Sequence, residues 1–393
     1  MISFEEALAI VSNNLPLTGT ERISYTSSSG RILAEDVVSD LNMPPFDKAA
    51  VDGFACRKED LHLYQTLQLL EVIAAGSTPT KIISEGTCSK IMTGAMLPEG
   101  ADCVIMVEQT TMTGEKTVKI NEYRTKENIA YFAEDIRIGA IVLTKGTLIK
   151  PQHIAVLATV GATQPLVFKR VKVSILSTGD ELTEPEFYPG PGKIRNSNSS
   201  QLVEQAKLLG AEVRYGGIVA DNPLISRKMI KEALQVSDVV ILSGGISMGD
   251  FDYIPAILKE EKMEILIKSI AVQPGKPTVF ARSGEKFVLG LPGNPVSSFN
   301  IFELLAKPFL FKMMGYDYKP STVKLPLCET YSRKATGRLG FVPATLNENG
   351  QVCPVGYHGS AHINALSTAE VLFMVPLGIQ QIQAGELVNV RFI

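Results

Sequence analysis

The sequence contains no tryptophan, only four histidines and only five cysteines in 393 residues. The cysteine count is odd, the cysteines lie far apart and no Cys-x-x-Cys pair occurs, so a zinc cluster has no support. We therefore expect free thiols in a reducing compartment. His358 and His362 lie four residues apart, but Gly359 and Ser360 between them argue against a helical metal pair. We interpret both as loop histidines.

An excess of one charge and long apolar runs are also missing. Lys and Arg total 38 against 41 Asp and Glu, a net charge of −3, which argues against general binding to a nucleic-acid backbone. No run of about 18 uncharged apolar residues occurs, so we expect no membrane span. Glu5 and Glu6 stand where a signal peptide carries Lys or Arg. These absences predict a cytoplasmic protein with neither nucleic acid nor membrane as a partner.

The patterns that are present change along the chain, and its length suggests two to four domains. Ser3 and Glu6 form a capping box that predicts an N-terminal helix. The pattern predicts a strand over 31–38, a mostly β region over 56–149 and a helix over 151–160. After about residue 167, strands and helices alternate, which predicts a parallel or mixed sheet covered on both faces. The expected elements are strands at 171–176, 211–219 and 238–245, helices near 198–209, 222–236, 253–261 and 295–314, and a small β domain from about 319.

Four loops in the α/β region follow strands and are rich in Gly, Pro and small polar residues. Ligands of open α/β sheets bind at the carboxyl ends of the strands, so parallel strands would place several of these loops on one rim. The loops are Ser177-Thr178-Gly179-Asp180-Glu181, Ser243-Gly244-Gly245-Ile246-Ser247-Met248-Gly249-Asp250, Pro274-Gly275-Lys276-Pro277 and Pro292-Gly293-Asn294-Pro295.

The chemistry of these loops suits an anion. Asn294 is a good N-cap and Pro295 a good first helical residue, and a helix N-terminus there would stabilise an anion by about 0.3–1 kcal/mol. Lys276 adds a positive charge, and Gly244 and Gly245 can form a nest of backbone amides. Each loop alone is also explained as an ordinary turn, helix start or solvated lysine, whereas four together favour an anion site.

The segment 245–249 formally matches the Gly-x-Ser-x-Gly nucleophile elbow of hydrolases. We reject that interpretation, because Ser243 and Gly244 interrupt the strand and Asp250 and Asp252 are poor continuations into a helix.

Carboxylates accompany the anion-binding loops. Any one of them could form a turn or cap a helix. Together they make sense if a divalent cation bridges them to a substrate, and Mg²⁺ typically takes one or two carboxylates plus substrate phosphates. The residues concerned are Asp52, Asp180, Glu181, Asp221, Asp250 and Asp252.

These motifs resemble a known family along essentially the whole chain. Residues 45–55, PFDKAAVDGFA, are similar to the PxFDxSAMDGYA signature of MoeA-type molybdopterin molybdenumtransferases. The chain is also similar to the E domain of gephyrin. The further matching segments, in order, are Ile91–Ala95, Pro98–Asp102, Ser177–Leu182, Ser243–Tyr253, Pro274–Pro277 and Gly290–Ser298.

The resemblance implies an α/β plus β fold in an elongated homodimer of four-domain chains. Domain I is discontinuous, and domain III resembles molybdopterin adenylyltransferases. The implied domains are I at 1–44 and 136–166, β-rich II at 45–135, α/β III at 167–318 and the C-terminal small β-barrel IV at 319–393.

The resemblance also implies a reaction in molybdenum cofactor biosynthesis. Molybdate, a substrate, is inserted into the dithiolene of adenylylated molybdopterin with the help of Mg²⁺, and AMP is released. A separate molybdopterin adenylyltransferase would supply the adenylylated substrate. One alternative is that the chain is itself such an adenylyltransferase, against which the extra β domains speak. The other is a gephyrin-like scaffold without catalysis, which the absence of gephyrin's extra N-terminal domain disfavours.

Site residues follow from the resemblance motif by motif. The implied catalytic residues are Asp52, Thr93, Asp135, Glu181, Asp221 and Asp252, of which Glu181, Asp221 and Asp252 would hold the metal. The implied substrate-binding residues are Ser177, Thr178, Gly179, Asp180, Ser243, Gly244, Gly245, Ser247, Gly249, Lys276, Pro292, Gly293, Asn294, Pro295, Arg338 and Ser360.

Two departures from the family pattern remove positive charge near the implied site. The family often has an Arg and a Gly in the segment that here reads Ala130-Tyr131-Phe132-Ala133. It also often has Lys where this chain has Gln273. These departures predict weaker binding of molybdate or phosphate unless other residues compensate.

Overall fold

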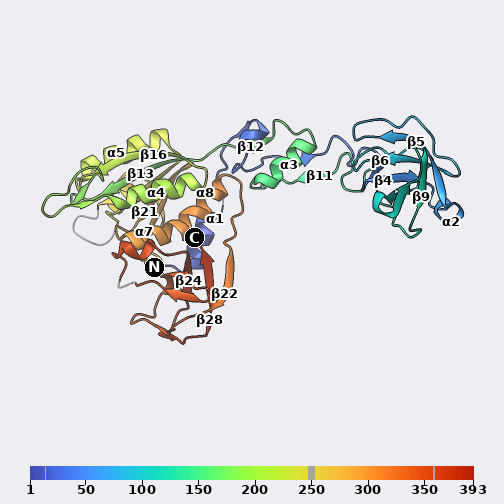
Figure 1. The fold of residues 1–393 in the computed structure, drawn as a ribbon. Coiled ribbons are helices and arrows are strands. Elements are labelled where there is room, and N and C mark those ends of the chain that lie inside the picture. Colours follow the sequence, from blue (N-terminus) through green and yellow to red (C-terminus); the bar gives the residue numbers. More distant parts are fainter. Residues whose placement is uncertain (14, 247–252, 357–358) are drawn as a thin grey trace. The chain divides into compact units, whose positions relative to one another are not determined.

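The computed structural model describes residues 1–13, 15–246, 253–356 and 359–393, which form two compact units. The first unit comprises Met1–Glu35, Gly146–Lys150 and Leu166–Ile393, and the second comprises Asp36–Lys145 and Pro151–Pro165 (Figure 1). Within the described ranges, no helix combines the length and the apolar character needed to cross a lipid bilayer. The division into four domains remains a prediction.

A six-stranded mixed sheet forms the centre of the first unit. Its first four strands are parallel to one another, so the carboxyl ends of those four meet along one edge, and the fifth strand is antiparallel to both of its neighbours. In spatial order the strands are β16 (Glu212–Val219), β13 (Lys172–Thr178), β17 (Val239–Ser243), β21 (Lys286–Leu291), β20 (Val279–Ser283) and β18 (Glu264–Ile267). The predicted alternation of strands and helices is confirmed.

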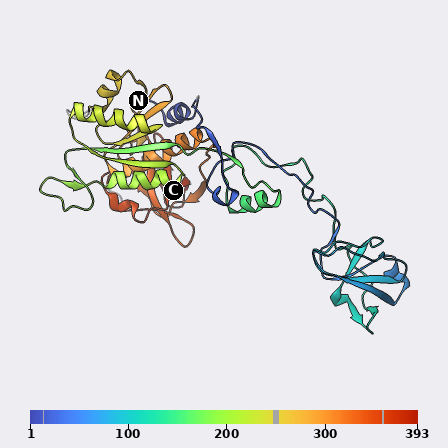
Figure 2. The same cartoon turned by 90° about the horizontal axis from the view of Figure 1, so that it is seen from above.

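Helices cover both faces of this sheet (Figure 2). Because side chains alternate along a strand, Val239 and Ile241 of β17 enter one core, whereas Val240 and Leu242 enter the other. The first core is completed by α1 (Phe4–Ser12), α4 (Ser197–Leu208), α7 (Pro295–Ile301) and α8 (Lys307–Met313). The second is completed by α5 (Pro223–Val236) and α6 (Ile254–Glu260).

Two predictions about helices can be compared directly with the structure. Ser3 Oγ accepts from Glu6 N at 3.0 Å, and Ser3 N donates to the Glu6 carboxylate at 2.7 Å, which confirms the capping box. The helix expected over 295–314 is present, although its middle turn, η3 (Phe302–Ala306), is a π-helix.

A second six-stranded sheet occupies the C-terminal part of the first unit. Its strands are β19 (Val272–Gln273), β24 (Leu339–Leu346), β26 (Val371–Val375), β28 (Leu387–Phe392) and β22 (Thr322–Pro326), with β25 (Val352–Pro354) paired to β24. The short elements of this unit are β1 (Thr20–Arg22), η1 (Tyr25–Ser27), β12 (Leu166–Phe168), β14 (Leu182–Thr183), β15 (Ile194–Arg195), β23 (Tyr331–Ser332), η4 (Ile363–Leu366) and β27 (Gln381–Ile382). Closure of this sheet into a barrel remains a prediction.

The expectation of five free thiols is wrong. Cys328 and Cys353 form a disulfide, and their Cα atoms lie 5.2 Å apart. The backbone brings them together, because Cys328 N donates to the carbonyl of Val352. The other three cysteines are free and buried.

The second unit contains a β sheet with its own apolar core. Its strands in spatial order are β7 (Cys103–Met106), β4 (Gly53–Cys56), β6 (Thr87–Ile91), β5 (Thr66–Ile73), β9 (Thr117–Ile120) and β8 (Thr110–Met112). Its other elements are β2 (Val37–Val38), β3 (Lys48–Ala49), α2 (Asp60–Leu63), η2 (Val107–Gln109), β10 (Ile129–Ala130), β11 (Ile141–Leu143) and α3 (Pro151–Thr159). The helix predicted over 151–160 is confirmed.

The strand predicted over 31–38 is largely wrong. Only Val37–Val38 forms a strand there, while Ile32 and Leu33 make isolated bridges to Leu148 and Val167. Ile32, Leu33 and Val37 are buried without a continuous ladder, whereas Val38 is exposed.

Candidate functional site

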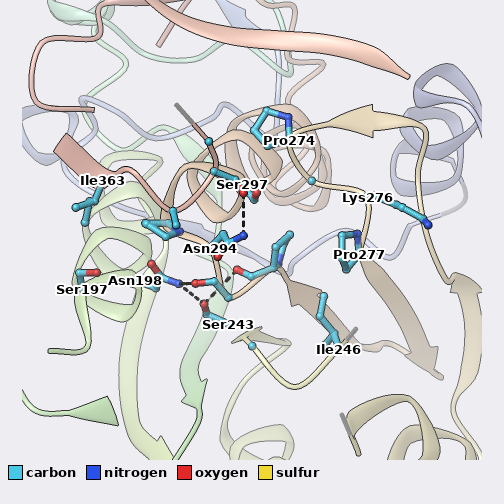
Figure 3. Close-up of a pocket in the computed structure, with 18 of the residues that line it drawn as sticks. Ser197, Asn198, Ser243, Ile246, Pro274, Lys276, Pro277, Asn294, Ser297 and Ile363 are labelled. Carbon is cyan, nitrogen blue, oxygen red and sulfur yellow. Dashed lines mark hydrogen bonds between the residues drawn. The ribbon is translucent and has the colours of Figure 1, made fainter. Parts of the chain in front are cut away.

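A cavity of about 1490 Å³ opens in the first unit at the carboxyl ends of the parallel strands (Figure 3). Four chain segments that follow β13, β16, β17 and β21 line it. These segments contribute Ser177–Gly179 with Glu181, then Asp221, then Ser243–Ile246, and finally Pro292–Pro295 with Ser297. Loops from four different strands therefore meet at one rim, because those strands run parallel in one sheet.

The C-terminal sheet supplies the other wall of the cavity. The Gln273–Pro277 loop follows β19, which pairs with β24 of that sheet. Further lining residues come from around β23 and from the segment before η4, namely Tyr331, Ser332, Arg333, Lys334, Arg338, Gly359, Ser360, Ala361 and Ile363. The α/β sheet and the C-terminal sheet thus build the cavity together.

Asn198, in the first turn of α4, ties two of the rim loops together. Its Nδ2 donates to Ser243 Oγ at 2.8 Å and to the carbonyl of Gly293 at 2.7 Å (Figure 3). One amide group therefore holds the loops after β17 and β21 in register. The motifs did not single out Asn198, although the polar run Asn196–Ser200 at a helix start was a usable signal.

The start of α7 differs from the prediction. Asn294 occupies the N-cap position, but its side chain makes no capping bond, and its Nδ2 instead donates to Ser360 Oγ at 2.8 Å. The carbonyl of Ser360 accepts from Val296 N at 3.1 Å. Ser360 therefore satisfies one of the N–H groups of the helix N-terminus, which the sequence predicts to face an anion.

Gly244 and Gly245 are required by a close approach of two strands. Both have positive φ, 92° and 66°. A Cβ on Gly244 would lie 2.7 Å from the carbonyl oxygen of Thr178, and one on Gly245 would lie 2.7 Å from its hydroxyl. Neither position tolerates a side chain without displacing β13 or its loop.

Three buried oxygens at the cavity have no hydrogen-bond partner among the described residues. They are Ser177 Oγ, Thr178 Oγ1 and Gln273 Oε1. Buried polar groups in native proteins are nearly always partnered. These oxygens therefore favour a polar ligand at this wall.

The charged lining is mainly cationic. Lys276 is exposed, and in the described part of the chain its ammonium group has no partner. Arg333 is a structural exception, because its guanidinium donates to the carbonyls of Ile379, Arg338 and Pro376 at 2.9, 2.8 and 2.6 Å. Burial lowers the pKa of Arg333. The cations of the lining are Arg195, Lys276, Arg333, Lys334 and Arg338.

Two of the predicted metal ligands, Glu181 and Asp221, line the same cavity. Asp221 is engaged with Asp180, since each carboxylate accepts from the other's backbone N–H, at 3.1 and 3.3 Å. Across the ranges that the structure covers, no cluster of three or more His, Cys, Asp or Glu side chains could hold a metal alone. Two carboxylates plus phosphate oxygens of a substrate nevertheless match what Mg²⁺ prefers, so the donor set fits that ion.

Asp52 and Thr93 belong to the second unit and contact each other. Asp52 Oδ1 accepts from Thr93 N at 2.7 Å and from Thr93 Oγ1 at 2.8 Å. The backbone and side-chain hydrogen bonds from Thr93 lower the pKa of Asp52, so the carboxylate is held in its ionised form. Asp135 also lies in this unit, exposed, with its N–H donating to the carbonyl of Met43.

Most of the predicted site residues surround the cavity, although their roles remain predictions. Asp180 does not line it, and Asp52, Thr93 and Asp135 lie in the second unit. Ser247, Gly249 and Asp252 lie outside the described residues. Lining residues that the motifs missed include Ile194, Arg195, Asn198, Tyr331 and Arg333.

Comparison with known proteins identifies the family. Residues 2–161 match the family model "MoeA N-terminal region (domain I and II)", and residues 328–393 match "MoeA C-terminal region (domain IV)". The intervening residues 174–312 match "Probable molybdopterin binding domain". The chain belongs to the MoeA family. A Staphylococcus epidermidis relative named "Molybdopterin molybdenumtransferase" is 38% identical over 99% of this chain and 95% of its own length.

Other MoeA relatives agree over the full length. A Staphylococcus aureus protein of the same name is 35% identical over 99% of this chain and 95% of its own length. The crystal structure of the molybdopterin biosynthesis MoeA protein from Pyrococcus horikoshii OT3 is similar, with a TM-score of 0.86, 29% identity and coverage of 100% of both chains. The fold and the family are therefore the same along the whole chain.

Proposed function

We propose that this chain is a molybdopterin molybdenumtransferase, which inserts molybdate into adenylylated molybdopterin and releases AMP in molybdenum cofactor biosynthesis. The observation that carries the proposal is the cavity itself. Four loops of the α/β sheet and the Gln273–Pro277 loop converge on one mainly cationic, polar space. Such a space suits an oxyanion and a phosphorylated substrate at once.

The positively charged side chains that line the cavity neutralise the negative charge of the reactants. Lys276 and Arg338 bind molybdate or phosphate oxygens, and the backbone of Pro292–Asn294 approaches the substrate closely. Glu181 and Asp221, with Asp252, would hold Mg²⁺, which would supply charge neutralisation at the phosphoanhydride. Asp52, kept ionised by Thr93, accepts a proton from water or orients it during cleavage of the phosphoanhydride.

Partners follow from this chemistry. The chain works as a homodimer in which Asp52 and Thr93 of one copy complete the cavity of the other. Light scattering at micromolar concentration tests this, and a fully active monomer would contradict it. The adenylylated substrate comes from a separate molybdopterin adenylyltransferase.

The function is tested by reconstitution. The purified chain is mixed with adenylylated molybdopterin, molybdate and Mg²⁺, and AMP and active cofactor are followed together. We expect AMP and cofactor to form in step, with no ATP consumed. Consumption of ATP with accumulation of adenylylated product would instead show an adenylyltransferase. Binding without either product would indicate a scaffold.

A further inference from the structure

An exposed loop with two aromatic side chains stands beside the cavity. Residues 184–193, here called the flap, connect β14 and β15 and project beyond the strand ends of the sheet (Figure 2). Phe187 is 65% exposed and Tyr188 is 90% exposed. The residues at the base of the flap, Leu182, Ile194 and Arg195, line the cavity.

Polar contacts hold the flap at its base. Arg195 Nε donates to the carbonyls of Pro185 and Phe187 at 3.1 and 3.3 Å. Tyr215 Oη donates to the Glu184 carboxylate at 2.7 Å. The aromatic tip is therefore presented to solvent by a defined backbone path.

Arg195 joins the tip of the flap to the cavity. Its guanidinium carbon lies 6.0 Å from the centroid of the Tyr188 ring, and Arg195 itself lines the cavity. Only its Nε has a hydrogen-bond partner among the described residues. The remaining N–H groups can bind a phosphate, because a guanidinium matches phosphate geometry.

The cavity wall offers little stacking surface of its own. Of its described lining residues, only Tyr331 is aromatic, and that side chain is half-buried. A substrate with a flat heterocycle gains considerably from stacking on an aromatic ring. Tyr188, with its ring almost entirely open, is placed to supply it.

We propose that Tyr188 and Arg195 form a recognition subsite for a phosphorylated planar heterocycle. The ring of the ligand stacks on Tyr188, and its phosphate binds the free N–H groups of Arg195. The inference rests on the proposed function, whose substrate carries an adenine and a pterin ring, each with a phosphate. Tyr188 acts in substrate selection and not in the chemical step.

The absence of tryptophan allows a direct binding test. Tyr188→Trp places the only tryptophan of the chain in the flap, and its fluorescence is followed during titration with AMP and, separately, with neopterin. We expect saturable quenching by at least one of them, and the one that quenches assigns the ring. Ribose 5-phosphate, which lacks a heterocycle, should not quench. Leu208→Trp is the matched control, because Leu208 is 86% exposed on α4 and does not line the cavity.

A kinetic test separates recognition from structure. Tyr188→Ala should raise KM for adenylylated molybdopterin about tenfold, the scale of one lost stack, while kcat stays parental. Leu208→Ala should change neither constant. No quenching by either ring, together with a parental KM in a variant that releases AMP, would overturn the subsite and leave the proposed function intact. If the parent releases no AMP, the proposed function fails, and the tryptophan titration still decides the subsite.

Discussion

Asp52 in the second unit and Glu181 in the first are both carboxylates next to glycine-containing turns, yet their surroundings differ. Asp52 Oδ1 accepts two hydrogen bonds from Thr93, which lower its pKa. Glu181 is exposed, lines the cavity and has no side-chain partner in the described part of the chain. The comparison teaches that hydrogen bonds within its own unit hold the carboxylate of Asp52, whereas the carboxylate of Glu181 is left open to a ligand in the cavity.

Removing the negative charge of Asp52 or of Glu181 should reduce AMP release more than any other substitution considered. Asp52→Asn and Glu181→Gln keep the size of each side chain, and each should cut AMP release about a hundredfold, the scale of a lost acid–base group. Melting temperature should change little, because neither substitution opens a cavity. The measurement is AMP release against Mg²⁺ concentration. Glu186→Gln, an exposed carboxylate of the flap, is the control. Near-parental rates at every Mg²⁺ level would show that Asp52 and Glu181 only form turns.

The next effect concerns Lys276, whose ammonium group has no partner among the residues that the structure describes. Lys276→Ala should raise KM for molybdate or for the adenylylated substrate about tenfold, as expected for one lost hydrogen bond to a charged group. The fold should persist, since Lys276 is exposed. Steady-state kinetics measure the effect, beside Lys268→Ala as an exposed lysine outside the cavity lining. Unchanged constants would make Lys276 a solvated loop residue.

Introducing a positive charge at position 273 should lower KM, and this change should be smaller than the increase caused by Lys276→Ala. Gln273 stands where the family often has Lys, and its Oε1 is buried at the cavity without a partner among the described residues. Gln273→Lys should lower KM for molybdate severalfold, although repulsion from Lys276 limits the gain. Gln273→Met, of similar length without charge, is the control. An equal or higher KM for the lysine variant would contradict the prediction.

The smallest expected change is a shift in the pH profile, and it tests whether Thr93 lowers the pKa of Asp52. Hydrogen bonds from Thr93 lower the pKa of Asp52, so the carboxylate stays ionised to lower pH than usual. Thr93→Val removes the hydroxyl donor and keeps the backbone N–H, so the pKa rises part of the way towards its ordinary value. Activity on the acid side should therefore fall away at higher pH than in the parent. A pH profile of AMP release with an unmoved acid limb would contradict this.

Local chemistry explains what could be predicted from the sequence. The capping box of Ser3 and Glu6 needs only residues three apart, and the strand–helix alternation after 167 needs only the spacing of apolar residues. The common rim of the loops in the α/β sheet could be predicted because parallel strands have their carboxyl ends at the same edge.

Long-range contacts explain what could not. Asn294 was expected to cap α7, but its side chain donates to Ser360, which lies 66 positions further along the chain. Cys328 and Cys353 pair because an isolated bridge between Leu327 and Val352 brings them together, which spacing alone does not reveal. Arg195 lines the cavity as part of β15, which pairs with β14 on the other side of the flap.

The most direct test of the account is complementation between inactive chains. Purified Asp52→Asn and Glu181→Gln proteins are mixed under conditions that exchange subunits, and AMP release is measured. If each cavity uses Asp52 from one copy and Glu181 from the other, half of the dimers are hybrids with one intact site, and about a quarter of parental activity returns. If both residues serve the cavity of their own chain, every hybrid site carries one substitution. Activity that stays at the level of the separate variants, with subunit exchange demonstrated, would contradict the account.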